Sequence, residues 1–215
     1  MKTINQMRGF RKFRSLAVMS GALAIMTIAT GCRKDDDGPS GPKLSPVTEA
    51  ANTTVTAIAD AVYSGGGHSP VTTESTITFA ASGTIKDISK MVLEMNVAHT
   101  WGQDISFALQ SPDGTRRDFI YRAGGQGNYI AANLYRFNST FTGTIPFGGN
   151  IDFPAGDYKE SKGDYPAITL EPIFSSFSGK QINGTWKLLI TDHESQIVGS
   201  LKSWKLHFAE GALQQ

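Results

Sequence analysis

The strongest constraint on the fold is a pair of tryptophan-bearing segments near the C-terminus, residues 184–192 and 199–208. In the first, Trp186 is followed at alternate positions by Leu188 and Ile190. In the second, Trp204 is followed in the same way by Leu206 and Phe208. Successive side chains of a β-strand point to opposite faces, so this period of two predicts strands with one buried face. We expect two antiparallel strands joined by a short polar hairpin loop.

The same alternation occurs upstream, over residues 91–98, 105–110 and 117–121. A Ser-Pro-Asp-Gly turn at residues 111–114 separates the last two, with proline presetting φ and glycine releasing the chain. Residues 123–184 are rich in Gly, Pro, Asn and Ser, which indicates short strands and long loops. No sustained helical periodicity follows the N-terminal leader. Many short strands with frequent turns predict an all-β fold, and we expect a jelly-roll β-sandwich.

Residues 1–31 have the composition of an export signal, with five basic residues, no acidic residue and an apolar run before Cys32. This run is shorter than the roughly 20 residues that a membrane-spanning helix needs. Cys32 is the sole cysteine, and its position after a small residue is similar to a bacterial lipobox. An ordinary secretory signal with an incidental cysteine is the alternative. We expect lipidation of Cys32 and a lipid anchor in the outer membrane of a Gram-negative bacterium, at the cell surface.

Residues 32–73 are rich in Pro, Ser, Thr, Ala and Gly, with too few large apolar residues to form a core. The acidic run at residues 35–37 is similar to a signal that sends lipoproteins to the outer face, and a solvated spacer is the alternative. We predict a flexible tether over residues 32–73. Within it, residues 50–62 fit either a short helix or a first strand. The folded domain is expected over residues 74–210.

Charge and cysteine content argue against a nucleic-acid-binding protein and against a disulfide-stabilised one. Without the leader, 15 basic residues face 19 acidic ones, a net charge of about −4, so nucleic acid is not an expected partner. With Cys32 lipidated, no disulfide is available. The fold must therefore rest on its hydrophobic core.

The chain lacks the motifs of catalysis and of zinc binding. None of the four histidines lies in a serine-protease motif, and there is no Gly-x-Ser-x-Gly elbow and no His-Glu-x-x-His. His193 lies between Asp192 and Glu194, which suggests acid and base chemistry. A solvated polar cluster in a hairpin loop is the simpler interpretation. We expect that the chain is not an enzyme.

The order of the two tryptophan segments, preceded by His99-Thr100-Trp101 and by Ser-Pro-Asp-Gly-Thr at residues 111–115, resembles a known module. It is the P domain (P/Homo B domain) that follows the catalytic domain of subtilisin-like proprotein convertases. The resemblance covers about residues 74–208. It implies a jelly-roll sandwich related in shape to galactose-binding modules, which packs on a protease and stabilises it.

The resemblance also implies a calcium ion. Many bacterial P domains that are similar to this chain hold calcium through their loops. The family pattern that falls on residues 99–105 places its aspartate at Asp104, and the aspartate after the first tryptophan strand falls on Asp192, with Glu194 nearby. Calcium takes six to eight oxygen ligands, which carboxylates and backbone carbonyls supply. We predict these three acids as Ca²⁺ ligands. Capping of turns by the same acids is the alternative.

Three functions are consistent with these observations. The first is a noncatalytic surface module that binds or stabilises a partner, and the second is an accessory domain of a subtilisin-like serine endopeptidase system. The third is a glycan-binding module, which the loop aromatics suggest. These aromatics are Tyr129, Tyr135, Tyr158 and Tyr165.

Overall fold

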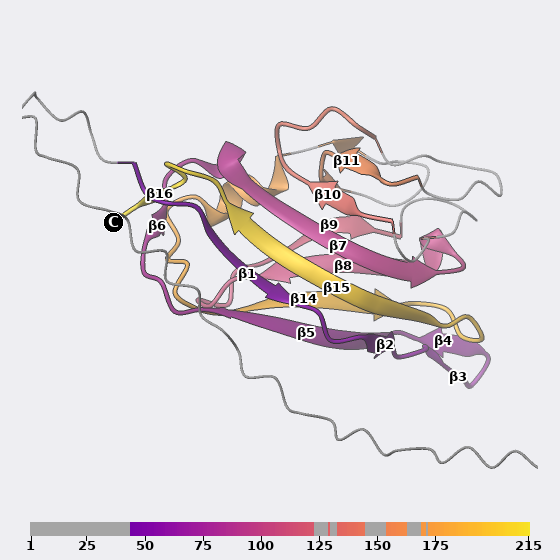
Figure 1. Ribbon diagram of the computed structural model, residues 1–215. Coiled ribbons are helices and arrows are strands. Elements are labelled where there is room, and N and C mark those ends of the chain that lie inside the picture. The colour runs from indigo at the N-terminus through magenta and orange to yellow at the C-terminus, as the bar shows by residue number, and fades with distance from the viewer. Residues whose placement is uncertain (1–43, 123–128, 130–132, 145–153, 163–168, 171) are drawn as a thin grey trace, which may run out of the picture. The chain divides into compact units, whose positions relative to one another are not determined.

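A computed structural model describes residues 44–122, 129, 133–144, 154–162, 169–170 and 172–215. These residues form strands and short 3-10 helices, with two larger sheets that face each other (Figure 1). The predicted all-β sandwich is therefore confirmed. Within this part of the chain, no helix has the length and apolar character needed to cross a membrane.

The first sheet has six strands in the order β1-β15-β7-β10-β11, and β2 also pairs with β15. Its pairings are antiparallel, except that β10 and β11 run parallel. The strands are β1 (Thr48–Asn52), β2 (Thr56–Ile58), β7 (Met91–His99), β10 (Tyr135–Phe137), β11 (Gly156–Tyr158) and β15 (Gly199–Phe208).

The second sheet has four antiparallel strands in the order β5-β14-β8-β9. They are β5 (Val71–Phe79), β14 (Gly184–Asp192), β8 (Ile105–Gln110) and β9 (Arg116–Tyr121). Three two-stranded sheets pair β3 (Val62–Ser64) with β4 (Gly67–Ser69), β6 (Thr84–Ile85) with β16 (Leu213–Gln214), and β12 (Ser161–Lys162) with β13 (Thr169–Leu170). The 3-10 helices are η1 (Ile88–Lys90), η2 (Gly102–Asp104) and η3 (Ile173–Phe177).

The core between the two larger sheets holds the apolar faces that the alternation predicted. Trp186 and Trp204 are 0% and 1% exposed. The indole N–H of Trp186 donates to the carbonyl of Ile182 at 2.9 Å, and that of Trp204 donates to the hydroxyl of Ser75 at 2.9 Å. Because Trp204 lies on β15 and Ser75 on β5, the second bond joins the two sheets.

The two tryptophan strands do not pair with each other, so the predicted hairpin was wrong. β14 lies in the four-stranded sheet and β15 in the six-stranded one. Consecutive strands are neighbours in most but not all folds, and the alternation of a single strand carries no information about its partner. Residues 193–198 therefore connect the two sheets at one end of the sandwich.

The predicted tether over residues 32–73 extends too far, because the folded domain begins well before residue 74. β1 pairs with β15 along its whole length, from Thr48 opposite Phe208 to Asn52 opposite Trp204, and β2 continues this pairing. Of the two options for residues 50–62, strand is the correct one. An added strand is held by its backbone hydrogen bonds and needs few large apolar side chains, which is why composition misled. Residues 32–43 lie outside the described part of the chain.

Candidate functional site

The three acids predicted to bind calcium lie at one end of the sandwich, where β7, β14 and the β3–β4 hairpin end or turn (Figure 1). Asp104 ends η2, Asp192 ends β14, and Glu194 follows in the connection to β15. The N–H of His193 donates to the carbonyl of Asp104 at 2.8 Å, which ties the connection to η2. We define the loop-end cluster as Asp104, Asp192 and Glu194 with their partners His68, His99 and Arg122.

Asp192 is fully buried and has a protein partner on each carboxylate oxygen. One oxygen lies 3.4 Å from Nε2 of His99, and the other accepts the N–H of Glu194 at 3.1 Å. The other ring nitrogen of His99 faces the backbone of Trp101, with its carbonyl at 2.9 Å and its N–H at 3.2 Å. An aspartate that holds a histidine in place also occurs in catalytic triads, but there the ring contacts a nucleophile. Here the ring contacts backbone, so the pair joins β14 to the end of β7.

Glu194 is half-buried and lies between two basic side chains from different elements. One carboxylate oxygen accepts Nη2 of Arg122 at 2.8 Å, and the other lies 3.3 Å from Nε2 of His68. Arg122 has a positive φ of 47° and also donates Nε to the carbonyl of Gln103 at 3.1 Å. Charge-assisted bonds of this kind are stronger than neutral ones. Glu194 thus holds the β3–β4 hairpin and the end of β9 to the connection.

Asp104 differs from the other two acids, because among the described residues its carboxylate has no hydrogen-bond partner. It is 5% exposed. Burial raises the pKa of this carboxyl to about 6. The neighbouring His99 opposes the shift in pKa, and Asp192 and Glu194 add to it. A group that is desolvated and close to other acids disfavours its own charged form. Asp104 is therefore the carboxylate of the loop-end cluster that accepts no hydrogen bond from a described residue.

This geometry bears on the fit of a calcium ion. Within the described ranges, no group of three or more His, Cys, Asp or Glu side chains is arranged to hold a metal. The oxygens of Asp192 and Glu194 are engaged by protein donors, which leaves Asp104 as the side chain that fits a cation. Calcium also accepts backbone carbonyls as ligands. A site here would therefore depend most on Asp104 with carbonyl oxygens, and the three-carboxylate set stays a prediction.

A serine–histidine contact in the same region was missed at the sequence level. The hydroxyl of Ser106 lies 2.8 Å from Nε2 of His193 and accepts the N–H of Arg122 at 3.2 Å. A serine bonded to a histidine is the arrangement of an activated nucleophile. However, Ser106 is 3% exposed within β8, so a substrate has no access to it in this conformation. No sequence signal connects these residues, because the contact depends on how β8 and the end of β14 pair.

The aromatics that suggested glycan binding are mostly in the core. Tyr129, Tyr135 and Tyr158 are 2%, 1% and 6% exposed, so they do not form a stacking platform for a sugar. Their rings pack on one another, with Tyr129 and Tyr135 centroids 5.4 Å apart. Tyr165 lies outside the described residues. Cys32, the predicted lipidation site, also lies outside them.

Comparisons with known proteins support the sequence resemblance. The family model described as proprotein convertase P-domain matches residues 153–208, a segment that includes η3, β14 and β15. The predicted resemblance to a P domain is thus confirmed for this segment. A search of curated proteins finds no match.

Two solved structures are similar to this chain. The first is the serine protease of Aeromonas sobria, at 20% identity and a TM-score of 0.37, covering 80% of this chain and 28% of that one. The second is the complex of the Aeromonas sobria serine protease (ASP) with the chaperone (ORF2), at 19% identity and a TM-score of 0.37, covering 79% and 28%. This chain therefore spans little more than a quarter of the length of the structures that it matches.

Proposed function

Because residues 153–208 carry the sequence pattern of the proprotein convertase P domain, we propose that this chain is a noncatalytic module that binds or stabilises a protein partner. The partner is a component of a subtilisin-like proteolytic system. Lipid on Cys32 holds the module at the outer membrane, at the cell surface of a Gram-negative bacterium. Two or more acyl chains make such an anchor stable without a membrane-spanning helix.

The observation that carries this proposal is the position of the family match. It includes β14 and β15, which bring Trp186 and Trp204 into the core, so the matched segment contributes to the core of the folded domain. The resemblance implies a module that packs on a protease and stabilises it. The state of the polar groups at the loop end supports a role without catalysis, since Asp192 and Ser106 are buried and bonded to neighbouring elements.

A pull-down from intact cells with the lipidated protein tests partner and location together. We expect a subtilisin-like protease, or a protein bound to one, to be recovered with the membrane-associated chain. The matched control is Cys32→Ser, which removes the acylated thiol and leaves the domain unchanged. A Cys32→Ser protein that still sediments with membranes would contradict the lipid anchor. Recovery of no protease-linked protein would contradict the proposed partner.

Labelling with a fluorophosphonate, which reacts with activated serines, tests the noncatalytic role. We expect no labelling of the folded chain. The control is Ser106→Ala, which removes the hydroxyl next to His193. Labelling of the native chain that disappears in Ser106→Ala would show that this serine is a reactive nucleophile, and the noncatalytic assignment would be wrong.

A calcium-dependent form of the same function rests on Asp104. When bound, the ion would neutralise a buried carboxylate that accepts no hydrogen bond from a described residue. We expect millimolar Ca²⁺ to raise the Tm of the native chain and EDTA to lower it, with no response in Asp104→Asn. A Tm that is indifferent to both additions would remove calcium from the proposal.

A further inference from the structure

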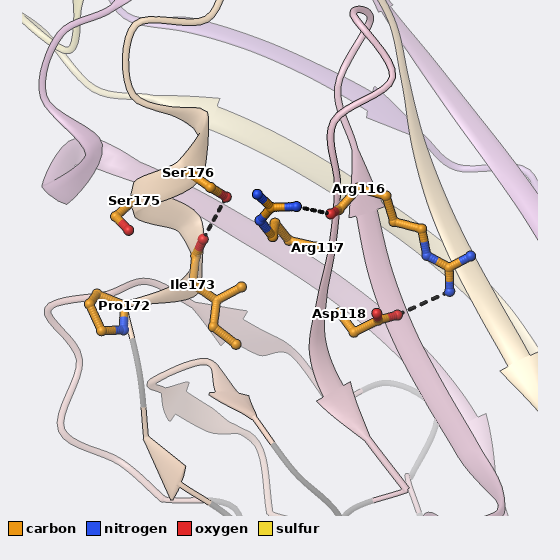
Figure 2. A pocket seen from close by; sticks show the side chains of 7 residues that line it. All are labelled: Arg116, Arg117, Asp118, Pro172, Ile173, Ser175 and Ser176. Atoms are coloured by element: carbon orange, nitrogen blue, oxygen red, sulfur yellow. Dashed lines mark hydrogen bonds and ion pairs between the residues drawn. The ribbon is translucent and has the colours of Figure 1, made fainter.

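A groove of ≈ 530 Å³ lies between β9 and η3, on a different part of the domain from the loop-end cluster. Figure 2 shows it as a space between the strand on one side and the 3-10 turn on the other. β9 is the last strand in the order of its sheet, and η3 and β12 lie beside it. The lining residues are Arg116, Arg117, Asp118, Pro172, Ile173, Ser175 and Ser176.

The two walls of the groove are fixed by the core beneath them. Phe119 on β9 and Phe174 on η3 are both 0% exposed, and their ring centroids lie 5.6 Å apart. The N–H of Phe174 donates to the carboxyl of Glu160 at 3.0 Å, and Glu160 is itself fully buried. A binding surface whose walls are held by packed aromatics loses little conformational entropy when a ligand binds. The groove is therefore a preformed feature of the fold.

The charge in the groove is unbalanced at Arg117. Of the four arginines at described positions, Arg116, Arg122 and Arg136 each pair with a carboxylate, and Arg117 pairs with none. Its Nη1 donates to the carbonyl of Arg116 at 2.7 Å. Figure 2 shows the Arg117 side chain reaching from β9 toward Ser176, while the ion pair of Arg116 and Asp118 lies on the opposite side of the strand. A guanidinium has five N–H donors, so those of Arg117 beyond this one bond have no acidic partner among the described residues.

We propose that this groove binds an extended, carboxylate-bearing segment of a partner protein, with Arg117 as the anchoring residue. This inference rests on the proposed role as a partner-binding module and names the surface that performs it. A guanidinium binds a carboxylate with two parallel hydrogen bonds, which adds geometric specificity to the charge. The exposed hydroxyl of Ser175 adds a donor at the rim, and the half-buried Ile173 offers apolar contact beside it.

The exposure of the groove favours a peptide over a small metabolite. Pockets for small molecules enclose most of the ligand surface and are lined mainly by apolar and aromatic side chains. Here Arg116, Arg117, Asp118, Pro172 and Ser175 are all exposed to solvent, and the lining is charged and polar. Recognition of acidic motifs by arginine side chains is a recurring mode of peptide binding. An acidic segment supplies the negative charge that no described residue places opposite Arg117.

Fluorescence anisotropy with a defined probe tests the proposal on the full chain. The probe is a fluorescein-labelled hexapeptide amide in which glutamate alternates with valine, and the comparison peptide has glutamine in place of glutamate. We expect saturable binding of the glutamate peptide, weaker binding in higher salt, and no binding of the glutamine peptide. Arg117→Ala should raise the Kd by at least about tenfold, because hydrogen bonds to charged groups are the strong ones. The Kd of Arg117→Lys should lie between those of the native chain and Arg117→Ala. Lysine keeps the positive charge but cannot form two parallel hydrogen bonds to a carboxylate.

The matched control is Lys187→Ala, which removes one positive charge from the exposed face of β14 and leaves the groove unchanged. Its Kd should equal that of the native chain, and circular dichroism should show that all variants are folded. Equal binding by Arg117→Ala and the native chain would overturn the proposal. So would full competition by an equal concentration of inorganic phosphate, which would indicate a site for any small anion.

A pull-down with Arg117→Ala separates failure of this proposal from failure of the proposed function. If the native chain and Arg117→Ala recover the same protease-linked partner equally well, the module binds its partner through another surface, and the groove proposal is wrong. If the partner is recovered by the native chain and lost in Arg117→Ala, both proposals are supported.

Discussion

The loop-end cluster and the β9–η3 groove contain similar charged residues in opposite physical situations. In the cluster, Asp192 is fully buried, and its oxygens are occupied by His99 and a backbone N–H. In the groove, Arg117 is exposed and has no carboxylate partner among the described residues. Charges that are buried and bonded hold a fold together, and charges that are exposed and unpaired are available to a ligand. The comparison teaches that two of the three acids that resemble a family site, Asp192 and Glu194, are committed to structure here.

The largest effect on stability is expected for a substitution in the hydrophobic core that supports both regions. Trp204→Ala removes a buried indole and its hydrogen bond to Ser75 across the sheets, which should lower the free energy of unfolding by about 3–5 kcal/mol. Urea denaturation followed by circular dichroism measures the loss. A change below about 1 kcal/mol would show that the two sheets are not held together at this point.

The comparison itself is sharpened by removing one acid from each region. Asp192→Ala leaves the buried ring of His99 and the part-buried N–H of Glu194 without their carboxylate partner, so we expect a loss of about 2–3 kcal/mol. Asp118→Ala breaks the exposed pair with Arg116, where both side chains are more than two fifths exposed. That change should cost less than about 1 kcal/mol. Similar losses in the two variants, measured by urea denaturation, would break the distinction between the regions.

A pH series tests whether Asp104 is the uncompensated member of the cluster. Its pKa is raised from 3.8 to about 6 on folding, so the folded state binds more protons than the unfolded state between these values. The free energy of unfolding therefore falls as pH rises through this window and is constant above it. Asp104→Asn is neutral at every pH, so in EDTA it should be more stable than the native chain by about 1–2 kcal/mol at pH 8.

The same variant should show little or no advantage at pH 4, where the native carboxyl is protonated in the folded state. Urea denaturation at both pH values measures the difference. An Asp104→Asn protein that is less stable than the native chain at pH 8 would mean that the carboxylate is favourably bonded in the folded state.

The smallest effect on stability is expected in the groove. Arg117→Ala removes an exposed side chain that bonds only to the neighbouring backbone among the described residues, so the free energy of unfolding should change by less than about 0.5 kcal/mol. The same substitution should raise the Kd for the glutamate peptide by at least about tenfold. A loss of stability above about 2 kcal/mol would place Arg117 among the structural residues and would remove the contrast with Asp192.

The strands with clear alternation were predicted well from the sequence, and those without it were missed. Trp186 and Trp204 are buried as their spacing indicated, because the two-residue period follows directly from backbone geometry. β1 was assigned to the tether, since its short, polar sequence shows no apolar face of its own. In β9, a register shift lets Phe119 and Ile120 both turn inward, where strict alternation predicted only one of them. Such a bulge depends on the partner strand.

The candidate site was predicted only as a set of residues. The sequence placed Asp104, Asp192 and Glu194 near turns, but their partners lie far away in the chain, such as Arg122 and His68 for Glu194. Whether a carboxylate is available to a cation depends on these partners. The groove left no signal in the sequence at all, since Arg117 is notable only because the described residues provide it with no acid.

The sequence by itself determined that the chain forms strands, that its core contains two indole rings, and that residues 153–208 carry the P-domain pattern, because these properties follow from the identity and spacing of neighbouring residues. Only the tertiary structure decided which strands pair, which acids are neutralised and which arginine has no acidic partner among the described residues. These properties depend on distances between residues that are remote in the chain, and such distances exist only after the two sheets have packed together.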